Sequence, residues 1–301
     1  MSDLGARIAT IGTFDGVHKG HQSVLEDLNL RSRACGMEPL VVTFDRHPLE
    51  LVAPERAPKM LMSSTERYEK LRQLVPNVAV IEFDEAVRRL TAVEFMSMLC
   101  AEYGVEALLL GFNHRFGSDG LQRFEQFAAQ AEGIGMAVFQ AVEAQSDGDK
   151  ISSTIIRHAL TRGDVSMAAR YLTRPYRIVG RVTSGKQLGR KIGFPTANIE
   201  PDEPRQLVPK IGVYACVATC SDGRQYKAMV NIGVRPTVDV SGKPTIEAHL
   251  MDFAGDLYGS TVALDFVARI RDEKQFASLD DLIAELHHDK IKTETILAPA
   301  F

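Results

Sequence analysis

The sequence has few cysteines, no excess of positive charge and no long apolar run. Its four cysteines, Cys35, Cys100, Cys216 and Cys220, lack CxxC spacing and nearby ligand histidines, so we expect no zinc site. Its 35 lysines and arginines are outnumbered by 39 aspartates and glutamates. The formal net charge of -4 therefore predicts no general surface for nucleic acid.

No apolar run is long enough to span a bilayer, and the opening residues MSDLGARIATIGTF lack the basic start and apolar core of a signal peptide. The composition, 45% apolar and 25% charged, is that of a globular protein, and 301 residues suffice for two domains. We therefore expect a cytoplasmic protein without a membrane segment, in which any phosphate binding is local.

The first half alternates short β-rich apolar runs with amphipathic helical stretches. The runs are RIATIGTF, PLVVTF, VAVIEF, EALLLGF and MAVFQAV. Helices are expected from about His21, from about Ser64, and after each of the third and fourth runs. Thr91 and Glu94 have the spacing of a capping box, which marks a helix start. This alternation predicts an α/β domain with a parallel sheet.

The pattern changes after Arg177 to strand-like segments without intervening helices. These segments are YRIVGRV, GVYACVAT, YKAMVNIG, TIEAHLMD and TVALDFVARI, and they predict a small antiparallel barrel or sandwich. A final helix is expected from Ser278 to Asp289, with Asp281 at the capping-box position. Pro175 interrupts helix propagation, so the link between the halves is expected near Thr173 to Tyr176.

Residues 10–25, TIGTFDGVHKGHQSVL, combine a strand, a glycine-containing turn and the start of a helix. Gly16 and Gly20 let the backbone approach a phosphate closely, and the free amides and dipole of the helix favour negative charge there. His18 and His21 can donate hydrogen bonds to an α-phosphate whose charge grows during in-line displacement. The segment predicts a phosphate site that needs no covalent nucleophile.

A second segment, ISSTIIR, ends at Arg157. Ser153 or Thr154 can cap a helix and offer a hydroxyl, while Arg157 projects from the first turn. A guanidinium stays charged and binds two oxygens at once, which suits a polyphosphate. By itself the segment also fits an ordinary capped helix, and only the histidine motif favours a binding site.

Residues 180–199, GRVTSGKQLGRKIGFPTANI, are glycine-rich and basic but lack the spacing of a Walker A loop. Three glycines permit a loop to fold over phosphates, and three basic residues supply positive charge. These are Gly185, Gly189 and Gly193, and Lys186, Arg190 and Lys191. Thr196 and Asn198 lie on the same side of an extended chain and offer hard oxygen ligands suited to magnesium.

These segments together resemble a known family. GTFDGVHKGHQ, TFDRHP, GFNHRFG and ISSTIIR, in this order, resemble bacterial FAD synthetases, the bifunctional riboflavin kinase/FMN adenylyltransferases. GxxxGRKxGFPTAN, GVYA, NIGVRPT, TIEAHL, DLYG and IRDEKQF continue the resemblance, while Arg46 and His114 depart from the family pattern. The resemblance implies a Rossmann-like nucleotidyltransferase domain over residues 1–172 and an antiparallel β-barrel riboflavin kinase domain with a terminal helix over residues 175–301.

The resemblance also implies the chemistry. ATP and magnesium would serve phosphorylation of riboflavin to FMN and adenylylation of FMN to FAD with release of pyrophosphate. The implied catalytic residues are His18, His21 and Arg157 for adenylylation and Glu247 as the general base of the kinase. Thr196 and Asn198 would bind magnesium and ATP. The nucleotide and flavin site would comprise Gly12, Phe14, Asp15, Gly16, Gly20, Asn113, Ser153, Thr154, Gly185, Lys186, Gly189, Arg190, Gly193, Thr196 and Asn198.

Two other classes of function remain open from the sequence. One is a different nucleotidyltransferase that uses another phosphate acceptor or a cytidylyl donor, because the histidine motif recognises the nucleotide and not the acceptor. The other is a flavin-binding regulator that has lost catalysis. The combination of PTAN with Glu247 favours a riboflavin kinase over the first, and no charge-handling residue is missing as the second would require. The pair His287 and His288 is expected to be solvated.

Overall fold

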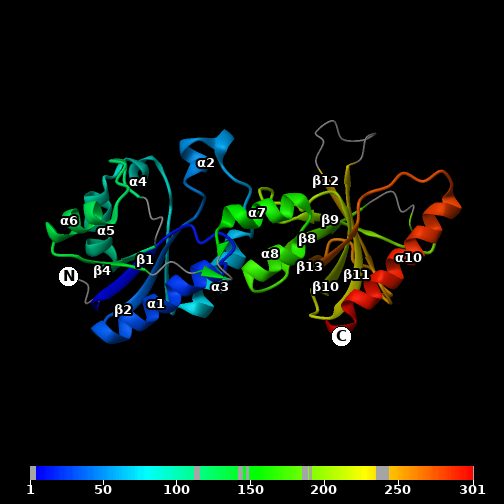
Figure 1. Ribbon diagram of the computed structural model, residues 1–301, viewed down its shortest axis with the longest axis horizontal. Helices are drawn as coiled ribbons and strands as arrows, with labels where there is room; N and C mark the ends of the chain where they lie inside the picture. The colour runs from blue at the N-terminus through cyan, green and yellow to red at the C-terminus, as the bar shows by residue number, and fades with distance from the viewer. Residues whose placement is uncertain are drawn as a thin grey trace. The chain divides into compact units, whose positions relative to one another are not determined.

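A computed structural model describes residues 5–111, 116–141, 145–146, 149–184, 189, 192–234 and 244–300. The chain divides into two compact units (Figure 1). Met1–Pro58 and Ser64–Ser152 form the first unit, and Lys59–Ser63 and Ser153–Phe301 form the second. The domain boundary expected between residues 172 and 175 stays a prediction, and two helices that precede it belong to the second unit.

The first unit contains a five-stranded parallel sheet, as the sequence predicts. The strands are β1 (Arg7–Ile11), β2 (Glu38–Phe44), β3 (Asn77–Ile81), β4 (Val105–Leu110) and β5 (Ala137–Gln140), in the order β3-β2-β1-β4-β5. The order reverses beside β1, because β2 and β4 flank it on opposite sides. In open α/β sheets the carboxyl ends of the strands at such a point form the usual ligand site.

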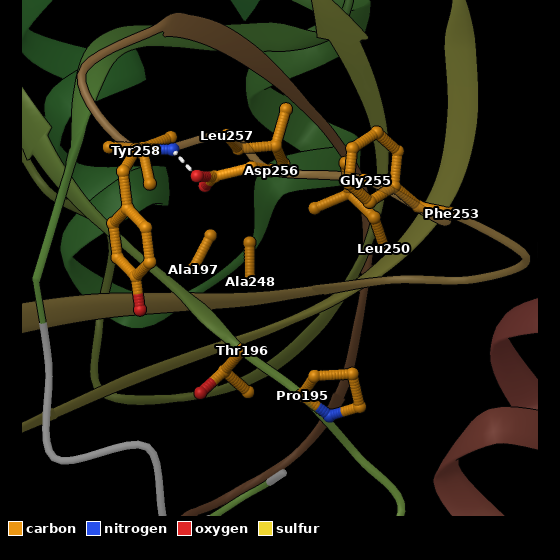
Figure 2. A pocket seen from close by; sticks show the side chains of 11 residues that line it. Pro195, Thr196, Ala197, Ala248, Leu250, Phe253, Gly255, Asp256, Leu257 and Tyr258 are labelled. Atoms are coloured by element: carbon orange, nitrogen blue, oxygen red, sulfur yellow. Dashed lines mark hydrogen bonds between the residues drawn. The ribbon is translucent and has the colours of Figure 1, made fainter.

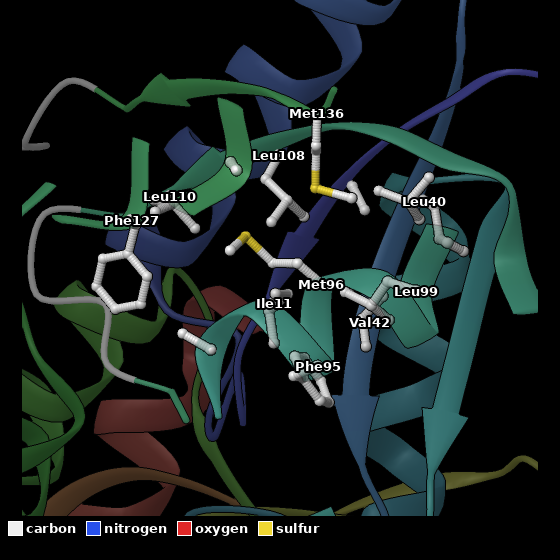
Figure 3. Close-up of a cluster of buried hydrophobic side chains, with 14 of the residues drawn as sticks. Ile11, Leu40, Val42, Phe95, Met96, Leu99, Leu108, Leu110, Phe127 and Met136 are labelled. Carbon is white, nitrogen blue, oxygen red and sulfur yellow. The ribbon is translucent and has the colours of Figure 1, made fainter. Parts of the chain in front are cut away.

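The helices of this unit are α1 (Lys19–Cys35), α2 (Leu49–Val52), the 3-10 helix η1 (Pro54–Arg56), α3 (Ser64–Leu74), α4 (Glu85–Arg89), α5 (Ala92–Tyr103) and α6 (Phe124–Glu132). Of these, α1, α3, α5 and α6 pack against strands of the sheet. Phe95, Met96 and Leu99 of α5 pack with Phe127 of α6 against one face (Figure 3). The capping box expected at the start of α5 is confirmed. Two short strands, β6 (Gln145–Ser146) and β7 (Asp149–Lys150), pair with each other.

The second unit is a closed antiparallel barrel, which decides between the barrel and the sandwich that the sequence left open. Its strands are β8 (Tyr176–Thr183), β9 (Ala197–Pro201), β10 (Gly212–Cys220), β11 (Gln225–Val234), β12 (Pro244–Leu250) and β13 (Thr261–Arg271). They are joined in the order β10-β11-β12-β9-β8-β13, which closes on itself. β9, a short strand between the longer β8 and β12, begins with the last two residues of the PTAN motif, Ala197 and Asn198.

Helices of the second unit pack outside the barrel. They are α7 (Ser153–Arg162), α8 (Val165–Leu172), α10 (Leu279–Leu297) and the 3-10 helix η2 (Ala298–Ala300). Ser278 caps α10 and accepts a hydrogen bond from the Asp281 amide, as expected. The expected end at Asp289 is wrong, because the helix continues to Leu297 along β10, β11 and β13. In the part of the chain that the structure describes, no helix has the length and apolarity needed to cross a membrane.

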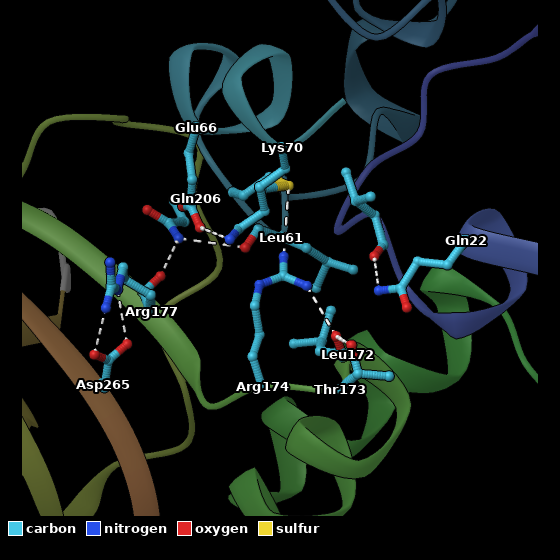
Figure 4. Close-up of polar contacts among 12 residues, drawn as sticks. Gln22, Leu61, Glu66, Lys70, Leu172, Thr173, Arg174, Arg177, Gln206 and Asp265 are labelled. Atoms are coloured by element: carbon cyan, nitrogen blue, oxygen red, sulfur yellow. Dashed lines mark hydrogen bonds and ion pairs between the residues drawn. The ribbon is translucent and has the colours of Figure 1, made fainter. Parts of the chain in front are cut away.

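A segment from the first half of the chain, Lys59–Ser63, belongs to the barrel unit. The Met60 amide donates to the Arg205 carbonyl at 2.9 Å. The side-chain amide of Gln206 donates to the Leu61 carbonyl at 3.3 Å, a contact visible in Figure 4. The same buried side-chain amide donates to the Arg177 carbonyl at 2.7 Å, so two backbone carbonyls satisfy a group that would otherwise lose its hydrogen bonds.

A buried ion pair fastens α10 to the barrel. Arg271 on β13 donates from Nε and from Nη2 to Asp289, at 2.8 and 2.7 Å. The Asp289 side chain is fully buried, and Glu285 lies 3.3 Å from the same guanidinium. Removal of one partner of a buried pair leaves the other charge uncompensated.

We expect Asp289→Ala to destabilise the barrel unit by about 3 kcal/mol, since it leaves the Arg271 guanidinium without its main acceptor. Chemical denaturation followed by circular dichroism measures this loss. Asp280→Asn, on the exposed first turn of α10, is the matched control and should change stability by less than about 1 kcal/mol. Equal losses of stability in the two variants would contradict a stabilising role for the buried ion pair between Arg271 and Asp289.

Candidate active sites

The turn after β1 is strained. Phe14 has a φ of 48° and Val17 a φ of 40°, values that non-glycine residues rarely adopt. Gly16, with a φ of 84°, adopts the same region without steric cost. The Val17 amide donates to the Phe14 carbonyl at 3.0 Å and closes the turn, in which Phe14, Asp15 and Val17 are buried. Backbone strain of this kind persists only where the surrounding structure holds it, and it clusters at ligand sites.

His18 and His21 stack on each other at the start of α1, with ring centroids 3.6 Å apart and planes inclined by 16°. His18 is the N-cap residue, and its Nδ1 accepts a hydrogen bond from the His21 amide at 3.3 Å. Because Nδ1 accepts, the neutral His18 ring carries its proton on Nε2 and can donate from there. The structure thus brings both predicted histidines together at a helix N-terminus, which favours an anion.

Gly12 and Gly20 make room for neighbouring rings. A Cβ atom on Gly20 would lie 3.2 Å from the imidazole of His18, and one on Gly12 would lie 3.2 Å from the ring of Phe14. Contacts this short require the neighbouring ring to shift. The close approach of Gly20 to a phosphate, which the sequence predicts, stays a prediction.

The predicted residues of the ISSTIIR segment lie at the start of α7. The helix begins at Ser153, so Ser153 and Thr154 lie within its first turn and the capping position falls on Ser152, where the sequence predicted Ser153 or Thr154. Arg157, the fifth residue of the helix, donates from Nε to the Lys59 carbonyl at 2.7 Å. This hydrogen bond orients the guanidinium within the second unit.

The two halves of the predicted adenylylation site belong to different units. His18 and His21 lie in the first unit and Arg157 in the second, so their meeting in one site stays a prediction. Asn113 lies outside the described residues, as does His114. Arg46, the other departure from the family pattern, is exposed and donates to the carboxylate of the preceding residue at 3.1 Å.

A row of polar side chains crosses four strands on the outer surface of the barrel. Asn198 on β9 pairs in register with Thr183 on β8 and with Glu247 on β12, and Glu247 pairs with Asn231 on β11. Paired residues of antiparallel strands project to the same face, and their buried neighbours in each strand project into the barrel. The structure therefore places the predicted Glu247 beside the predicted Asn198.

The loop before β9 folds tightly on Gly189. Its carbonyl accepts the amides of Ile192 and Phe194 at 3.2 and 2.9 Å, and a Cβ atom at this position would collide with the Phe194 carbonyl. Gly193 has a φ of 81°, which a side chain would strain. These two predicted glycines are thus required by the turn that precedes Thr196. Gly185, Lys186, Arg190 and Lys191 lie outside the described residues.

A pocket of about 320 Å³ opens beside Thr196 at one end of the barrel. Its walls are mostly apolar and include Ala197, Ala248 and Leu250. Figure 2 shows the side chains of Thr196 and Tyr258 at the same opening. An apolar cavity with a few polar groups is typical of a site for a small planar ligand.

His249 is a residue of this region that sequence reasoning missed. Its Nδ1 donates to the Pro195 carbonyl at 2.8 Å, directly before Thr196, and its ring lies 5.2 Å from that of Phe194. His287 of α10 is exposed, as expected, and its ring centroid lies 5.1 Å from that of Phe194. The signal in the sequence was spacing, because a residue two positions from Glu247 in a strand faces the same side.

The oxygen ligands of the PTAN motif suit a magnesium ion. Thr196 and Asn198 offer a hydroxyl and an amide oxygen two residues apart on an extended chain. Magnesium takes oxygen ligands and usually keeps several waters, so it needs few protein groups. Within the described ranges, no cluster of three or more His, Cys, Asp or Glu side chains could hold a metal ion.

Comparisons with known proteins match both units. The family model for FAD synthetase matches residues 2–155, and the model for riboflavin kinase matches residues 172–297. A bifunctional riboflavin kinase/FMN adenylyltransferase of Pseudomonas fluorescens is 39% identical over 97% of this chain and 94% of its own. The chain belongs to the family of bifunctional riboflavin kinase/FMN adenylyltransferases.

Other members of the bifunctional family and a solved structure extend this similarity. The Escherichia coli K12 protein of the same name is 37% identical over 94% of this chain and 90% of its own. A crystal structure from Streptococcus pneumoniae, titled a macrolide-efflux protein, has 30% identity and a TM-score of 0.85 and covers 97% of this chain and 96% of its own. The similarity thus covers nearly the whole chain and both candidate sites.

We expect the stability of the barrel unit to fall as the pH drops below about 6.5, in part because of His249. Burial lowers the pKa of His249 from its usual value of 6.5, although the Pro195 carbonyl opposes the shift. Below that value the unfolded chain binds a proton that the folded chain resists, so protonation favours unfolding. Thermal unfolding of wild type and His249→Gln between pH 7.5 and about 5 tests this.

The replacement of His249 should flatten the pH dependence, whereas His288→Gln, which removes an exposed histidine of α10, should leave it unchanged. An identical pH dependence in wild type and His249→Gln would show that the buried imidazole contributes nothing to it.

Proposed function

We propose that this chain phosphorylates riboflavin to FMN with its barrel unit and adenylylates FMN to FAD with its α/β unit, with ATP as the donor in both reactions. The observation that carries the proposal is the similarity, over both units, to relatives named for both activities. The cytoplasmic location expected from the sequence is part of the same proposal.

In the α/β unit, a phosphate oxygen of FMN attacks the α-phosphorus of ATP, and pyrophosphate leaves. His18 donates from Nε2, and His21, stacked on it, provides a second donor for the charge that grows on the α-phosphate. The amides at the start of α1 and the glycines of the turn favour the same anion. We assign Arg157, with Ser153 and Thr154, to the polyphosphate, and Asn113 to the nucleotide or flavin.

In the barrel unit, Glu247 accepts the proton of the ribityl 5'-hydroxyl as that oxygen attacks the γ-phosphorus and ADP leaves. Glu247 lies opposite Asn198 in the strand pairing, which supports a common site for base and nucleotide. Thr196 and Asn198 would hold magnesium, which neutralises phosphate charge when it is bound. The apolar pocket beside Thr196 suits the adenine base. We assign Gly185, Lys186 and Arg190 to the phosphates.

Two substitutions should separate the two activities. His21→Ala should lower adenylylation of FMN by about 100-fold or more because it removes a donor to the developing charge, and it should spare the kinase. Glu247→Gln should lower phosphorylation of riboflavin by about 1000-fold because an amide cannot accept the proton, and it should spare adenylylation. Separate assays, with riboflavin or with FMN as the acceptor, measure each rate by chromatography.

The matched controls are His288→Ala and Glu294→Gln, which remove side chains of the same types from α10 outside both proposed sites. Both controls should keep both rates. Unchanged FAD formation in His21→Ala would refute the role of that histidine, and unchanged FMN formation in Glu247→Gln would refute the general base.

A further inference from the structure

The largest fully buried side chain of the described residues is a cation. Arg67, on the inner side of α3, is only 1% exposed. Its Nη1 donates to the Thr13 carbonyl at 3.1 Å and its Nη2 to the Phe44 carbonyl at 2.7 Å. The guanidinium also lies over the ring of Tyr68, 5.2 Å from its centroid. Each of these partners belongs to the first unit.

The two carbonyls lie at the same edge of the parallel sheet. Thr13 follows β1 and Phe44 is the last residue of β2, and these strands are neighbours. The ladder between them ends where the Gly12 amide donates to the Val42 carbonyl at 3.0 Å. Arg67 therefore continues the connection beyond the last backbone hydrogen bond and bridges the two strand ends with one rigid, planar group.

Packing alone does not explain a guanidinium at this position. Burial of a charge is costly unless it is paired, and in the described part of the chain its contacts are to carbonyl and hydroxyl oxygens, with no acceptor for Nε. An apolar residue would fill the same space without that cost. An apolar side chain lacks the two N–H donors of the guanidinium. The carbonyls that these donors bind therefore indicate what the arginine does at this position.

The Thr13 carbonyl immediately precedes the strained turn. Phe14, with a φ of 48°, comes next in the chain, and the turn leads through Val17 to His18. A strained backbone relaxes unless its surroundings fix it. The hydrogen bond from Arg67 fixes the peptide at the entrance of this turn, and the capping interaction of His18 fixes its exit.

We propose that Arg67 is a positioning residue for adenylyl transfer. It holds the end of β1 against the end of β2, so that the turn presents His18 and His21 in the orientation that the reaction needs. This inference rests on the proposed function of the α/β unit. Arg67 acts through the backbone and through the histidines, and it need not touch either substrate.

The test compares Arg67→Met, Arg67→Lys and the control Arg72→Met, which removes an exposed arginine from the same helix. Arg67→Met should lower kcat for FAD formation from FMN and ATP by about 10- to 100-fold, because a displacement of about 1 Å in a catalytic group has this effect. KM for ATP should change by less than about threefold, since ground-state binding is largely kept. Arg67→Lys, which keeps one donor, should lie between Arg67→Met and wild type.

Kinase activity of the barrel unit in the same preparations reports intact protein and should be unchanged in all three variants. If Arg67→Met fails to fold, Arg67→Lys decides the question. Adenylylation at the wild-type rate in Arg67→Lys and in any folded Arg67→Met would overturn the proposal, as would a loss confined to KM.

A second measurement does not need activity. In histidine-labelled protein, the NMR signals of the His18 and His21 rings, assigned with single-histidine variants, should shift in Arg67→Met and Arg67→Lys and stay in place in Arg72→Met. If wild type forms no FAD, the proposed function fails, and these ring signals alone decide whether Arg67 positions the histidines. Ring signals unmoved in both Arg67 variants would contradict it.

Discussion

The register of the closed barrel is the constraint on which the proposed kinase site depends. Asn198, Glu247 and Asn231 meet on one face only because β9, β12 and β11 pair as they do. A shift of one residue in any of these strands would turn its polar side chain into the barrel interior. Closure of the barrel prevents such a shift, since each strand is paired on both sides. Backbone hydrogen bonds between the strands therefore position the side chains proposed as base and nucleotide ligands.

In the α/β unit, the candidate site residues are positioned without strand pairing. Its histidines lie beyond the last residue of a strand, where no ladder fixes the chain. The N-cap interaction of His18 and the hydrogen bond from Arg67 to the Thr13 carbonyl hold the strained turn there. This arrangement places donors at the sheet edge where the strand order reverses, the location at which open α/β sheets bind ligands.

Much of the fold could be predicted because its signals are local. The five apolar runs became the parallel sheet, and the spacing of Thr91 and Glu94 became a capping box, since both depend on residues close in sequence. The attachment of Lys59–Ser63 to the barrel unit could not be predicted, because it depends on hydrogen bonds to residues 98 or more positions away in the chain, such as those from the Met60 amide to the Arg205 carbonyl and from the Arg157 guanidinium to the Lys59 carbonyl. The end of α10 was misplaced because its last turns are held by packing on the barrel.

In the candidate sites, too, residues with local sequence patterns could be predicted and residues with distant partners could not. His18, His21, Thr196 and Asn198 stood out because each pair has a spacing that serves a ligand, and the structure places each pair at one location. Arg67 carries no such pattern, and the spacing of His249 from Glu247 does not reveal its partner, because each side chain binds a backbone carbonyl 54 positions away in the chain. A buried cation or imidazole that binds a distant carbonyl is recognisable only in three dimensions.

The most direct test is incubation of the purified chain with riboflavin, ATP and magnesium, with FMN and FAD followed over time by chromatography. The account predicts that FMN appears first and that FAD follows as FMN accumulates. FMN without FAD would contradict the assignment of the α/β unit, and the absence of both products would contradict the function proposed for the whole chain.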